Sequence, residues 1–373
     1  MAKLLRVGVI GIGTIGESHA NLLANGQIKG ACLAAIASSK IANSKKFTQA
    51  EYFSSGTGLI ASGQVDAVII ATPHKVHAEC VNAALALGIH VLVEKPLAAD
   101  VLTCRQMLDT ANTPQTIKLV FAAMFNQRTD SAHINIRQLI QQGLLGQLRR
   151  IQWTCTDWYR SQHYYNSSDW RATWQGEGGG ILINQCAHNL DLWQWFFGMP
   201  KKVRAFCRLG RYHNIEVEDE VTAYLEYEDG CSGIFISSTG ESPGTNRLEV
   251  VGELGRLLYE NGQLSLLRNE VAMSEFSQSS QSFFDKPNTK ETLFTLQAVA
   301  DQHQHLIQNF VDTINGGAQL IADARDGIRS VELANAMLYS SLNEKSVTLP
   351  FDTSLYAQRI EDLILKSEDV SPF

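Results

Sequence analysis

The sequence predicts an α/β protein of two domains, with a doubly wound parallel sheet in the first and a mostly antiparallel sheet in the second. Three observations predict it. The N-terminal third alternates short apolar runs with helical patterns, a glycine-rich turn follows the first of these runs, and residues 203–267 read as consecutive strands separated by turn signals. In a chain of 373 residues we therefore expect a first domain at 1–124 and a second at 125–373.

The first domain is expected to hold short buried strands that alternate with helices. We expect strands at Leu5–Ile10, Cys32–Ala37, Val65–Ala71, Ile89–Val93 and Ile117–Ala122, and helices at Thr14–Ala24, His77–Leu87 and Val101–Ala111. Because parallel strands need crossover connections, this alternation favours a parallel sheet covered by helices.

The pattern changes after residue 125. We expect a helix at Ala132–Gln142, a strand at Leu148–Thr156, an aromatic loop at Asp157–Trp174, a helix at Ile181–Phe197, a surface loop at Ser274–Glu291 and closing helices at Gln302–Ile314 and Ile328–Leu342. Within 203–267 the strands are broken at Asp229-Gly230, Pro243-Gly244, Glu253–Gly255 and Asn261-Gly262, which predicts an antiparallel sheet.

Composition excludes several classes of function. The net charge of −7 gives no attraction for nucleic acid, and no apolar run reaches the roughly 18–20 residues that span a bilayer. The N-terminus lacks the features of a signal peptide. Seven cysteines without C-x-x-C spacing indicate a reducing compartment, so we expect a cytoplasmic protein. His303 and His305 lack the further ligands of a zinc site, and we expect no metal.

The first turn carries Gly11-Ile12-Gly13-Thr14-Ile15-Gly16, a G-x-G-x-x-G motif between a strand and a helix. Gly11 allows a tight turn, Gly13 lets the backbone approach a pyrophosphate, and Gly16 lets the helix pack on the sheet. The free N–H groups at the helix N-terminus suit phosphates. We expect a dinucleotide here, the alternative being a glycine turn needed only for packing.

The end of the second strand indicates which dinucleotide is bound. An NAD site usually has an acid here for the ribose 2′-hydroxyl, but this chain has Ser38, Ser39 and Lys40. Two hydroxyls and an ammonium suit a 2′-phosphate, so we expect NADP more than NAD. The alternative is that Lys40 is an ordinary solvated residue.

Two further segments carry groups suited to proton transfer. Lys95, in Glu94-Lys95-Pro96, follows a buried strand at the sheet end where ligands bind. His188 follows three glycines, and on a helix Asn184 would share its face. An imidazole can take a proton from a hydroxyl, and a partly desolvated lysine can polarise one. The alternatives are a surface lysine and a structural histidine.

These motifs, in this order, resemble those of the Gfo/Idh/MocA family, the glucose–fructose oxidoreductase and inositol dehydrogenase group. Further matching segments are Ala71-Thr72-Pro73-His74-Lys75-Val76-His77-Ala78-Glu79 and Leu248-Glu249-Val250-Val251-Gly252-Glu253, so that the resemblance covers nearly the whole chain. It implies a Rossmann domain followed by an α/β domain built on a large, mostly antiparallel open sheet. It also implies a homo-oligomer, a dimer or a tetramer.

The resemblance also implies roles for single residues. It sets Lys95 beside the nicotinamide and the substrate, often before a cis proline, with Glu94 at the cofactor, and it makes His188 the helix histidine. Many dehydrogenases of the family carry Asp where this chain has Asn184, so Lys95 and His188 must carry the proton transfer. The T-P-x-x-x-H stretch lies along the cofactor in the family, and Asn126 and Arg128 follow the last strand near the nicotinamide. That stretch comprises Thr72, Pro73, His74 and His77.

The aromatic loop has two open interpretations. Tyr159, Arg160, Trp170 and Arg171 combine aromatic faces with guanidinium forks, which suit a sugar bearing a carboxylate or phosphate. The same residues could form a packed loop or a subunit contact.

We therefore expect an NAD(P)-dependent oxidoreductase that acts on a secondary alcohol or ketone of a sugar, cyclitol or related polyol. Two alternatives stay open: an NAD(P)-dependent glycosidase or lyase that oxidises its substrate transiently, and a non-catalytic sugar or dinucleotide sensor.

Overall fold

The computed structural model describes residues 4–369, which form two compact units. The first contains the chain up to Thr129 together with Ala300–Glu332, and the second contains Asp130–Val299 together with the chain from Leu333. The sequence suggested a single boundary at 124/125. Residues 300–332 group with the first unit because helix α9 (Gln302–Ile314) packs on α1 (Thr14–Ala24), on β5 (His90–Val93) and on the 3-10 turn η2 (Asn126–Thr129).

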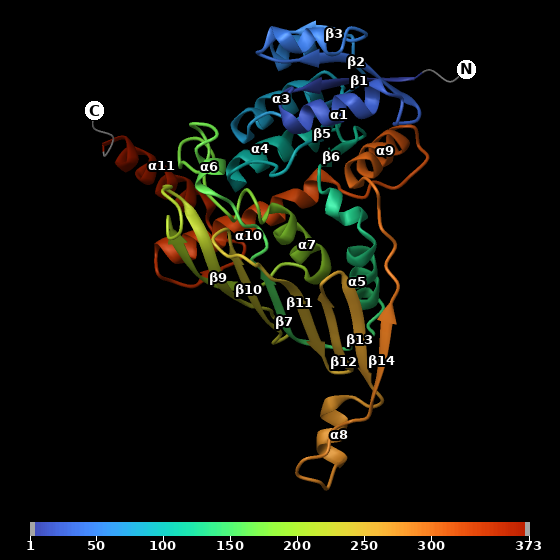
Figure 1. Ribbon diagram of the computed structural model, residues 1–373, viewed down its shortest axis with the longest axis vertical. Helices are drawn as coiled ribbons and strands as arrows, with labels where there is room; N and C mark the ends of the chain where they lie inside the picture. Colours follow the sequence, from blue (N-terminus) through green and yellow to red (C-terminus); the bar gives the residue numbers. More distant parts are fainter. Residues whose placement is uncertain (1–3, 370–373) are drawn as a thin grey trace. The chain divides into compact units, whose positions relative to one another are not determined.

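The first unit is a six-stranded parallel sheet, and it confirms the predicted doubly wound fold (Figure 1). The strand order is β3-β2-β1-β4-β5-β6, which is that of a dinucleotide-binding Rossmann sheet. The other elements are β1 Leu5–Ile10, β2 Ala31–Ala37, η1 Ile41–Lys45, β3 Glu51–Phe53, α2 Gly56–Ala61, β4 Ala67–Ile70, α3 His74–Ala86, α4 Val101–Ala111 and β6 Phe121–Ala123. From β1 the chain adds strands toward one edge of the sheet, and from β4 it adds them toward the other edge. The segments that follow β1 and β4 therefore lie at the topological switch point, where such sheets bind ligands.

The second unit is built on a nine-stranded sheet of order β14-β13-β12-β11-β7-β10-β9-β8-β15. Only β7 and β10 pair in parallel, so the prediction of a mostly antiparallel sheet is confirmed. The strands are β7 Leu148–Cys155, β8 Lys202–Leu209, β9 Glu218–Glu226, β10 Ser232–Ser238, β11 Asn246–Gly252, β12 Gly255–Glu260, β13 Gln263–Asn269, β14 Thr289–Phe294 and β15 Val347–Thr348. The helices are α5 Ser131–Gln141, α6 Gln162–Tyr165, α7 Ala187–Phe197, α8 Met273–Ser279 and α11 Thr353–Asp369, and α10 Ala324–Leu342 runs from the first unit into the second.

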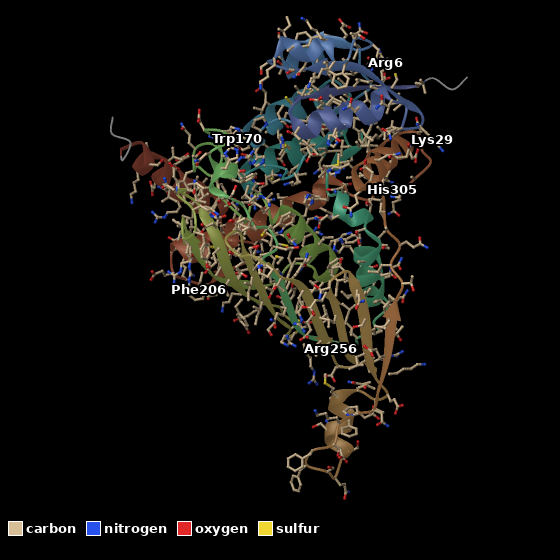
Figure 2. All side chains as sticks on the ribbon, in the orientation of Figure 1. Arg6, Lys29, Trp170, Phe206, Arg256 and His305 are labelled. Carbon is tan, nitrogen blue, oxygen red and sulfur yellow. The ribbon has the colours of Figure 1, made fainter. Side chains whose placement is uncertain are left out.

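One face of the large sheet is covered and the other is exposed in the single chain. Val221, Ala223 and Leu225 of β9 are buried, while the alternating Tyr224 is 44% exposed. Phe206 of β8, labelled in Figure 2, is 56% exposed. Helix α7 packs closely on the covered side. A Cβ at Gly233 of β10 would lie 2.7 Å from the ring of Trp193 in α7.

The structure corrects three expectations in the second unit. The predicted loop Ser274–Glu291 contains all of α8 except its first residue, together with the start of β14, and the chain also forms α11. None of the α8 residues is buried, and β14 is an exposed edge strand, so neither leaves an apolar pattern in the sequence. The predicted helix Ile181–Phe197 begins only at Ala187.

Candidate active site

The glycine turn after β1 is shaped by contacts of its first and third glycines. Gly11 has a φ of 93°, and a Cβ there would lie 2.6 Å from the carbonyl oxygen of Ala71. A Cβ at Gly16 would lie 1.9 Å from the carbonyl oxygen of Gly11. A Cβ at Gly13 would meet nothing within 4 Å. Close packing thus explains why residues 11 and 16 are glycines. At Gly13 no such packing exists, and the turn is open on its outer side.

That open side is also the N-terminus of a helix. Gly13 is the N-cap of α1 without a side-chain cap, and Thr14 and Ile15 are exposed while Ile12 is buried. The first backbone N–H groups of a helix have no partner within it and attract anions. Residues 13–15 thus present accessible backbone N–H groups of the kind that bind phosphate, and their role as a pyrophosphate site stays a prediction.

The three residues after β2 that the sequence predicts to meet the ribose differ in exposure. Ser38 is buried, and its hydroxyl accepts hydrogen bonds from the Lys40 N–H at 3.2 Å and from Asn43 Nδ2 at 2.9 Å. Asn43 also donates to the carbonyl oxygen of Ile12 at 3.2 Å. Ser38 therefore holds the turn beside the glycine motif, while Ser39 and Lys40 are exposed and accessible to a ligand.

The segment after β4 is fixed by a buried histidine. His77 Nε2 lies 2.9 Å from the carbonyl oxygen of Thr72, and Nδ1 lies 3.2 Å and 3.3 Å from those of Pro96 and Leu97. Burial lowers the pKa of His77. The ring thus joins the segment after β4 to the one after β5. His74 is half-buried in the first turn of α3, and Pro73 is its exposed N-cap.

Lys95 follows β5 and is half-buried, next to a cis Lys95–Pro96 bond. The buried Glu94 accepts the backbone N–H of Lys95 at Oε2, 3.2 Å away, and its Oε1 lies 2.8 Å from His19 Nε2 on α1. Burial alone would raise the pKa of Glu94, but the hydrogen bond to His19 and the positive charge of Lys95 outweigh it, so the pKa is lowered. The carboxylate thus connects the phosphate-facing helix to the lysine segment. The centroid of the His303 ring lies 5.6 Å from that of His19, with the two rings tilted by 45°, and burial lowers the pKa of His303.

The two predicted residues in η2 are bound within the protein. Asn126 is buried and donates to Gln302 Oε1 at 3.1 Å. Arg128 is 2% exposed, donates to the carbonyl oxygen of Ile321 at 3.3 Å and lies 3.6 Å from the carboxylate of Asp326. These contacts tie η2 to the returning segment 300–332.

In the second unit, the segment before α7 is held by a buried glutamate. Glu218 Oε1 accepts the backbone N–H groups of Gly180 at 2.9 Å and Leu182 at 3.1 Å, and the Glu218 carbonyl oxygen accepts that of Ile181 at 2.9 Å. Residues 181–186 form turns, and α7 begins only at Ala187. Asn184 therefore precedes the helix, and the expectation that it shares a helical face with His188 is wrong.

The Glu218 carboxyl is buried, and burial raises its pKa to about 7. Its Oε2 has no hydrogen-bond partner among the described residues. His188 is the second residue of α7 and is partly exposed, whereas its neighbours Asn189 and Asp191 are buried.

Asn184 belongs to a polar cluster with Glu177, Tyr164 and Arg171. Asn184 Nδ2 donates to Glu177 Oε1 and, at 3.4 Å, to the Tyr164 hydroxyl. Arg171 Nη1 donates to the same hydroxyl at 2.7 Å, and the guanidinium stacks over the Tyr164 and Trp170 rings. Glu177 is buried, and the other three are half-exposed.

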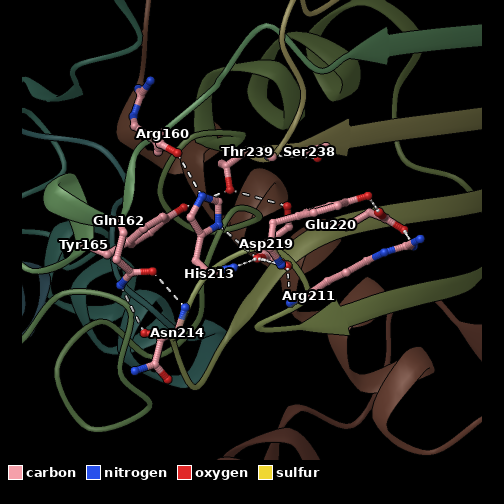
Figure 3. Close-up of polar contacts among 12 residues, drawn as sticks. Arg160, Gln162, Tyr165, Arg211, His213, Asn214, Asp219, Glu220, Ser238 and Thr239 are labelled. Carbon is pink, nitrogen blue, oxygen red and sulfur yellow. Dashed lines mark hydrogen bonds and ion pairs between the residues drawn. The ribbon is translucent and has the colours of Figure 1, made fainter.

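The preceding part of the aromatic loop is held by a histidine–carboxylate pair, which Figure 3 shows. The buried Asp219 accepts His213 Nδ1 at 3.0 Å, and His213 Nε2 lies 2.8 Å from the carbonyl oxygen of Arg160. The Arg160 guanidinium lies over the rings of Trp158 and Tyr164. Arg160 and Arg171 thus both contact Tyr164, whereas Tyr159 is 53% exposed.

Sequence reasoning missed His19, Tyr164, Glu177, His213 and Glu218. Tyr164, Glu177 and Glu218 matter because of their contacts with other segments, and the periodicity of the sequence does not show which segments meet. The available signals were the position of Glu177 directly before the three glycines, and of His19 on the face of α1 turned to the sheet.

Comparisons with known proteins agree with this arrangement. Residues 5–121 match the family described as "Oxidoreductase family, NAD-binding Rossmann fold", and residues 133–258 match the "GFO/IDH/MocA C-terminal domain". Inositol 2-dehydrogenase from Rhizobium meliloti is 24% identical over 92% of this chain and 99% of its own length. Myo-inositol 2-dehydrogenase from Thermotoga maritima is 22% identical over 92% and 98%.

Solved structures share the fold at low identity. The WlbA dehydrogenase from Bordetella pertussis, in complex with NADH and UDP-GlcNAcA, superposes with a TM-score of 0.77 at 23% identity and covers 94% of this chain and 100% of its own. Levoglucosan dehydrogenase with NADH and levoglucosan gives 0.77 at 20%, with coverages of 93% and 100%. Because residues 5–121 and 133–258 match the two domain models of one family, the protein belongs to the GFO/IDH/MocA family of NAD-binding oxidoreductases.

Proposed function

We propose that this chain is an NAD(P)-dependent dehydrogenase that transfers a hydride between nicotinamide and a secondary alcohol or ketone of a sugar, cyclitol or related polyol. The observation that carries the proposal is the open turn at Gly13, in a sheet of dinucleotide-binding order in which Lys95 follows the end of strand β5. The relatives named above act on inositols, which supports a polyol as the substrate class.

The residues of the first unit fit a dinucleotide. The backbone N–H groups of residues 13–15 would hold the pyrophosphate, and the exposed Ser39 and Lys40 would meet the ribose end. Since no acid stands there, we propose that NADP is preferred over NAD. Bound nicotinamide supplies the hydride acceptor in the oxidation direction.

The proton chemistry falls to Lys95 and His188. We propose that His188 takes the proton of the substrate hydroxyl as general base and that Lys95 donates a hydrogen bond to the developing alkoxide. Asn184 would hold a further hydroxyl of the substrate. The assignment of these residues to one reaction rests on family membership and on the chemistry of the side chains.

We also propose that the chain forms a homo-oligomer through the exposed face of the large sheet. Phe206, Tyr224 and Leu209 lie on β8 and β9 and are 56%, 44% and 43% exposed. Exposed aromatic and aliphatic side chains on adjacent strands are typical of a protein interface. Light scattering at micromolar concentration measures this directly.

A spectrophotometric screen tests the activity. Cyclitols, aldoses, uronates and keto-sugars are offered with NADP(H) and NAD(H), and the absorbance of the reduced nicotinamide is followed. We expect a net change with at least one cyclitol or sugar. Product formation without net nicotinamide reduction would instead indicate a transient-oxidation glycosidase or lyase. Binding of sugar and dinucleotide without turnover would indicate a sensor.

A further inference from the structure

We propose that Glu94 is a positioning residue that holds Lys95 after β5 as an ammonium group, and that His19 fixes Glu94 from helix α1. Lys95 then serves the reaction as a hydrogen-bond donor and not as its base. The inference rests on the proposed function, in which Lys95 contacts the developing alkoxide. It adds two residues that act on the reaction only through Lys95.

The buried carboxylate of Glu94 has a partner at each oxygen. Glu94 is 7% exposed, and His19 is fully buried. Oε1 of Glu94 lies 2.8 Å from Nε2 of His19, and Oε2 accepts the backbone N–H of Lys95 at 3.2 Å. Burial alone would raise the pKa of Glu94, but the hydrogen bond to His19 and the positive charge of Lys95 outweigh it, so the pKa is lowered. The group is therefore an ionised carboxylate at neutral pH, although it is buried.

Hydrogen-bond chemistry fixes the tautomer of His19. An ionised carboxylate only accepts hydrogen bonds, so His19 Nε2 must carry the hydrogen that it donates to Glu94. Nδ1 of His19 is buried and has no hydrogen-bond partner among the described residues. A second proton on the ring would leave a buried N–H group unsatisfied, which is costly. His19 is thus suited to orient the carboxylate rather than to neutralise its charge.

The charge of Glu94 is balanced by Lys95. The carboxylate also faces the imidazole rings of His19 of α1, His77 of α3 and His303 of α9. Burial lowers the pKa of His77 and of His303 from the usual 6.5, so both rings are neutral at pH 7 and above. The attraction between a carboxylate and an ammonium group favours the charged form of both. Without this partner, the half-buried Lys95 would tend toward the neutral amine.

The main chain on both sides of Lys95 is fixed as well. Glu94 binds the N–H of Lys95, and the carbonyl oxygens of Pro96 and Leu97 lie 3.2 Å and 3.3 Å from Nδ1 of the buried His77. The carboxylate of Glu94 thus acts on Lys95 in two ways, through the position of its backbone and through the charge of its side chain.

Competitive labelling of the full-length protein measures the charge of Lys95 without any substrate. Trace acetic anhydride acetylates the neutral amine of a lysine, and mass spectrometry follows the peptide that contains Lys95 as the pH is raised. In the wild type we expect the labelling midpoint of Lys95 at a pH no lower than that of the exposed Lys290. A midpoint about one pH unit or more below that of Lys290 would overturn the proposal, because Lys95 would then be suited to act as the base.

Two variants of Glu94 separate its charge from its contacts. Glu94→Gln keeps the size of the side chain and removes the charge, whereas Glu94→Asp keeps the charge on a shorter side chain. We expect the midpoint of Lys95 to fall by about one pH unit in Glu94→Gln and to stay close to that of the wild type in Glu94→Asp. Asp109→Asn is the matched control, because it removes an exposed carboxylate from the last turn of α4 in the same unit and should leave the midpoint unchanged. Equal midpoints in Glu94→Gln and the wild type would contradict the role of Glu94.

Two variants of His19 test whether its ring fixes the carboxylate. His19→Gln offers Glu94 an amide donor, whereas His19→Leu offers none, and both lack the imidazole, so the difference between their Tm values reports on Glu94. Without a donor, burial raises the folded-state pKa of Glu94 above its unfolded value, and stability is lost as pH rises through that interval. We expect the Tm of His19→Leu to fall below that of His19→Gln by about 2–4 °C between about pH 5 and pH 8. A difference that does not change with pH would overturn the role of His19.

The pH dependence of catalysis tests the consequence for the reaction. The best substrate of the spectrophotometric screen is used with the wild type, Glu94→Gln and Asp109→Asn. kcat/KM should fall at high pH as Lys95 loses its proton, and this limb should move to lower pH by about one unit in Glu94→Gln alone. A limb at the same pH in Glu94→Gln and the wild type would overturn the positioning role. If the wild type turns over no compound of the screen, the proposed function fails, whereas the labelling and Tm results would still support the pairing of Glu94 with Lys95.

Discussion

Substitution of the middle glycine of the first turn separates cofactor binding from folding. The structure leaves open space where a Cβ at Gly13 would lie, and the residue has a φ of −89°, which every amino acid adopts. The Cβ introduced by Gly13→Val therefore clashes with no atom of the described chain. Gly13 is the N-cap of α1 without a side-chain cap, so the change should cost no more than about 1 kcal/mol of stability.

The cost to binding is larger. A valine side chain at the open turn occupies the space that a pyrophosphate needs to reach the backbone N–H groups of residues 13–15. Hydrogen bonds to a charged group contribute roughly 1.5–3 kcal/mol each. Loss of two of them corresponds to a fall in dinucleotide affinity of about 10²–10⁴-fold.

Calorimetric titration with NADPH and NADH measures the affinity, and thermal unfolding measures the fold. Gly16→Ala is the contrasting variant, because its Cβ would lie 1.9 Å from the Gly11 carbonyl oxygen. It should lose about 1–3 kcal/mol of stability from overpacking. Dinucleotide affinity of Gly13→Val equal to that of the wild type would refute the phosphate site.

Four further predictions follow from the same structure. kcat/KM should favour NADP(H), and Lys40→Ala should reduce that preference; a clear wild-type preference for NAD(H) would contradict the assignment. His188→Ala should lower kcat by roughly 10²–10⁴-fold, and near-normal kcat in this variant would show that the histidine is structural. Lys95→Ala should lower kcat at least as strongly, while cofactor binding is retained. Because burial raises the pKa of Glu218 from 4.5 to about 7, the folded state holds the extra proton, and stability is lost as pH rises across that interval. Urea unfolding should show a loss of at most about 3 kcal/mol in the wild type, absent in Glu218→Gln; equal pH profiles would exclude Glu218 as the cause. Light scattering should give a dimer or tetramer, and a monomer would exclude the sheet-face interface.

The sequence predicted those features that local chemistry determines. β1, α1, α4 and α9 have the expected bounds, because their apolar periodicity and the glycine turn are local patterns. The roles of Gly11 and Gly16 in packing were also readable, since strand–turn–helix connections impose the same contacts wherever they occur.

Tertiary structure decided the rest, because it depends on contacts between distant segments. Asn184 lies in a turn that precedes α7, and the start of this segment is bound to Glu218, far along the chain, through the backbone N–H groups of Gly180 and Leu182. The amide of Asn184 is oriented by Glu177, and residues 300–332 return to the first unit through α9. The hydrophobic periodicity of the sequence indicates which residues are buried, but it does not indicate which distant polar groups come into contact when the chain folds.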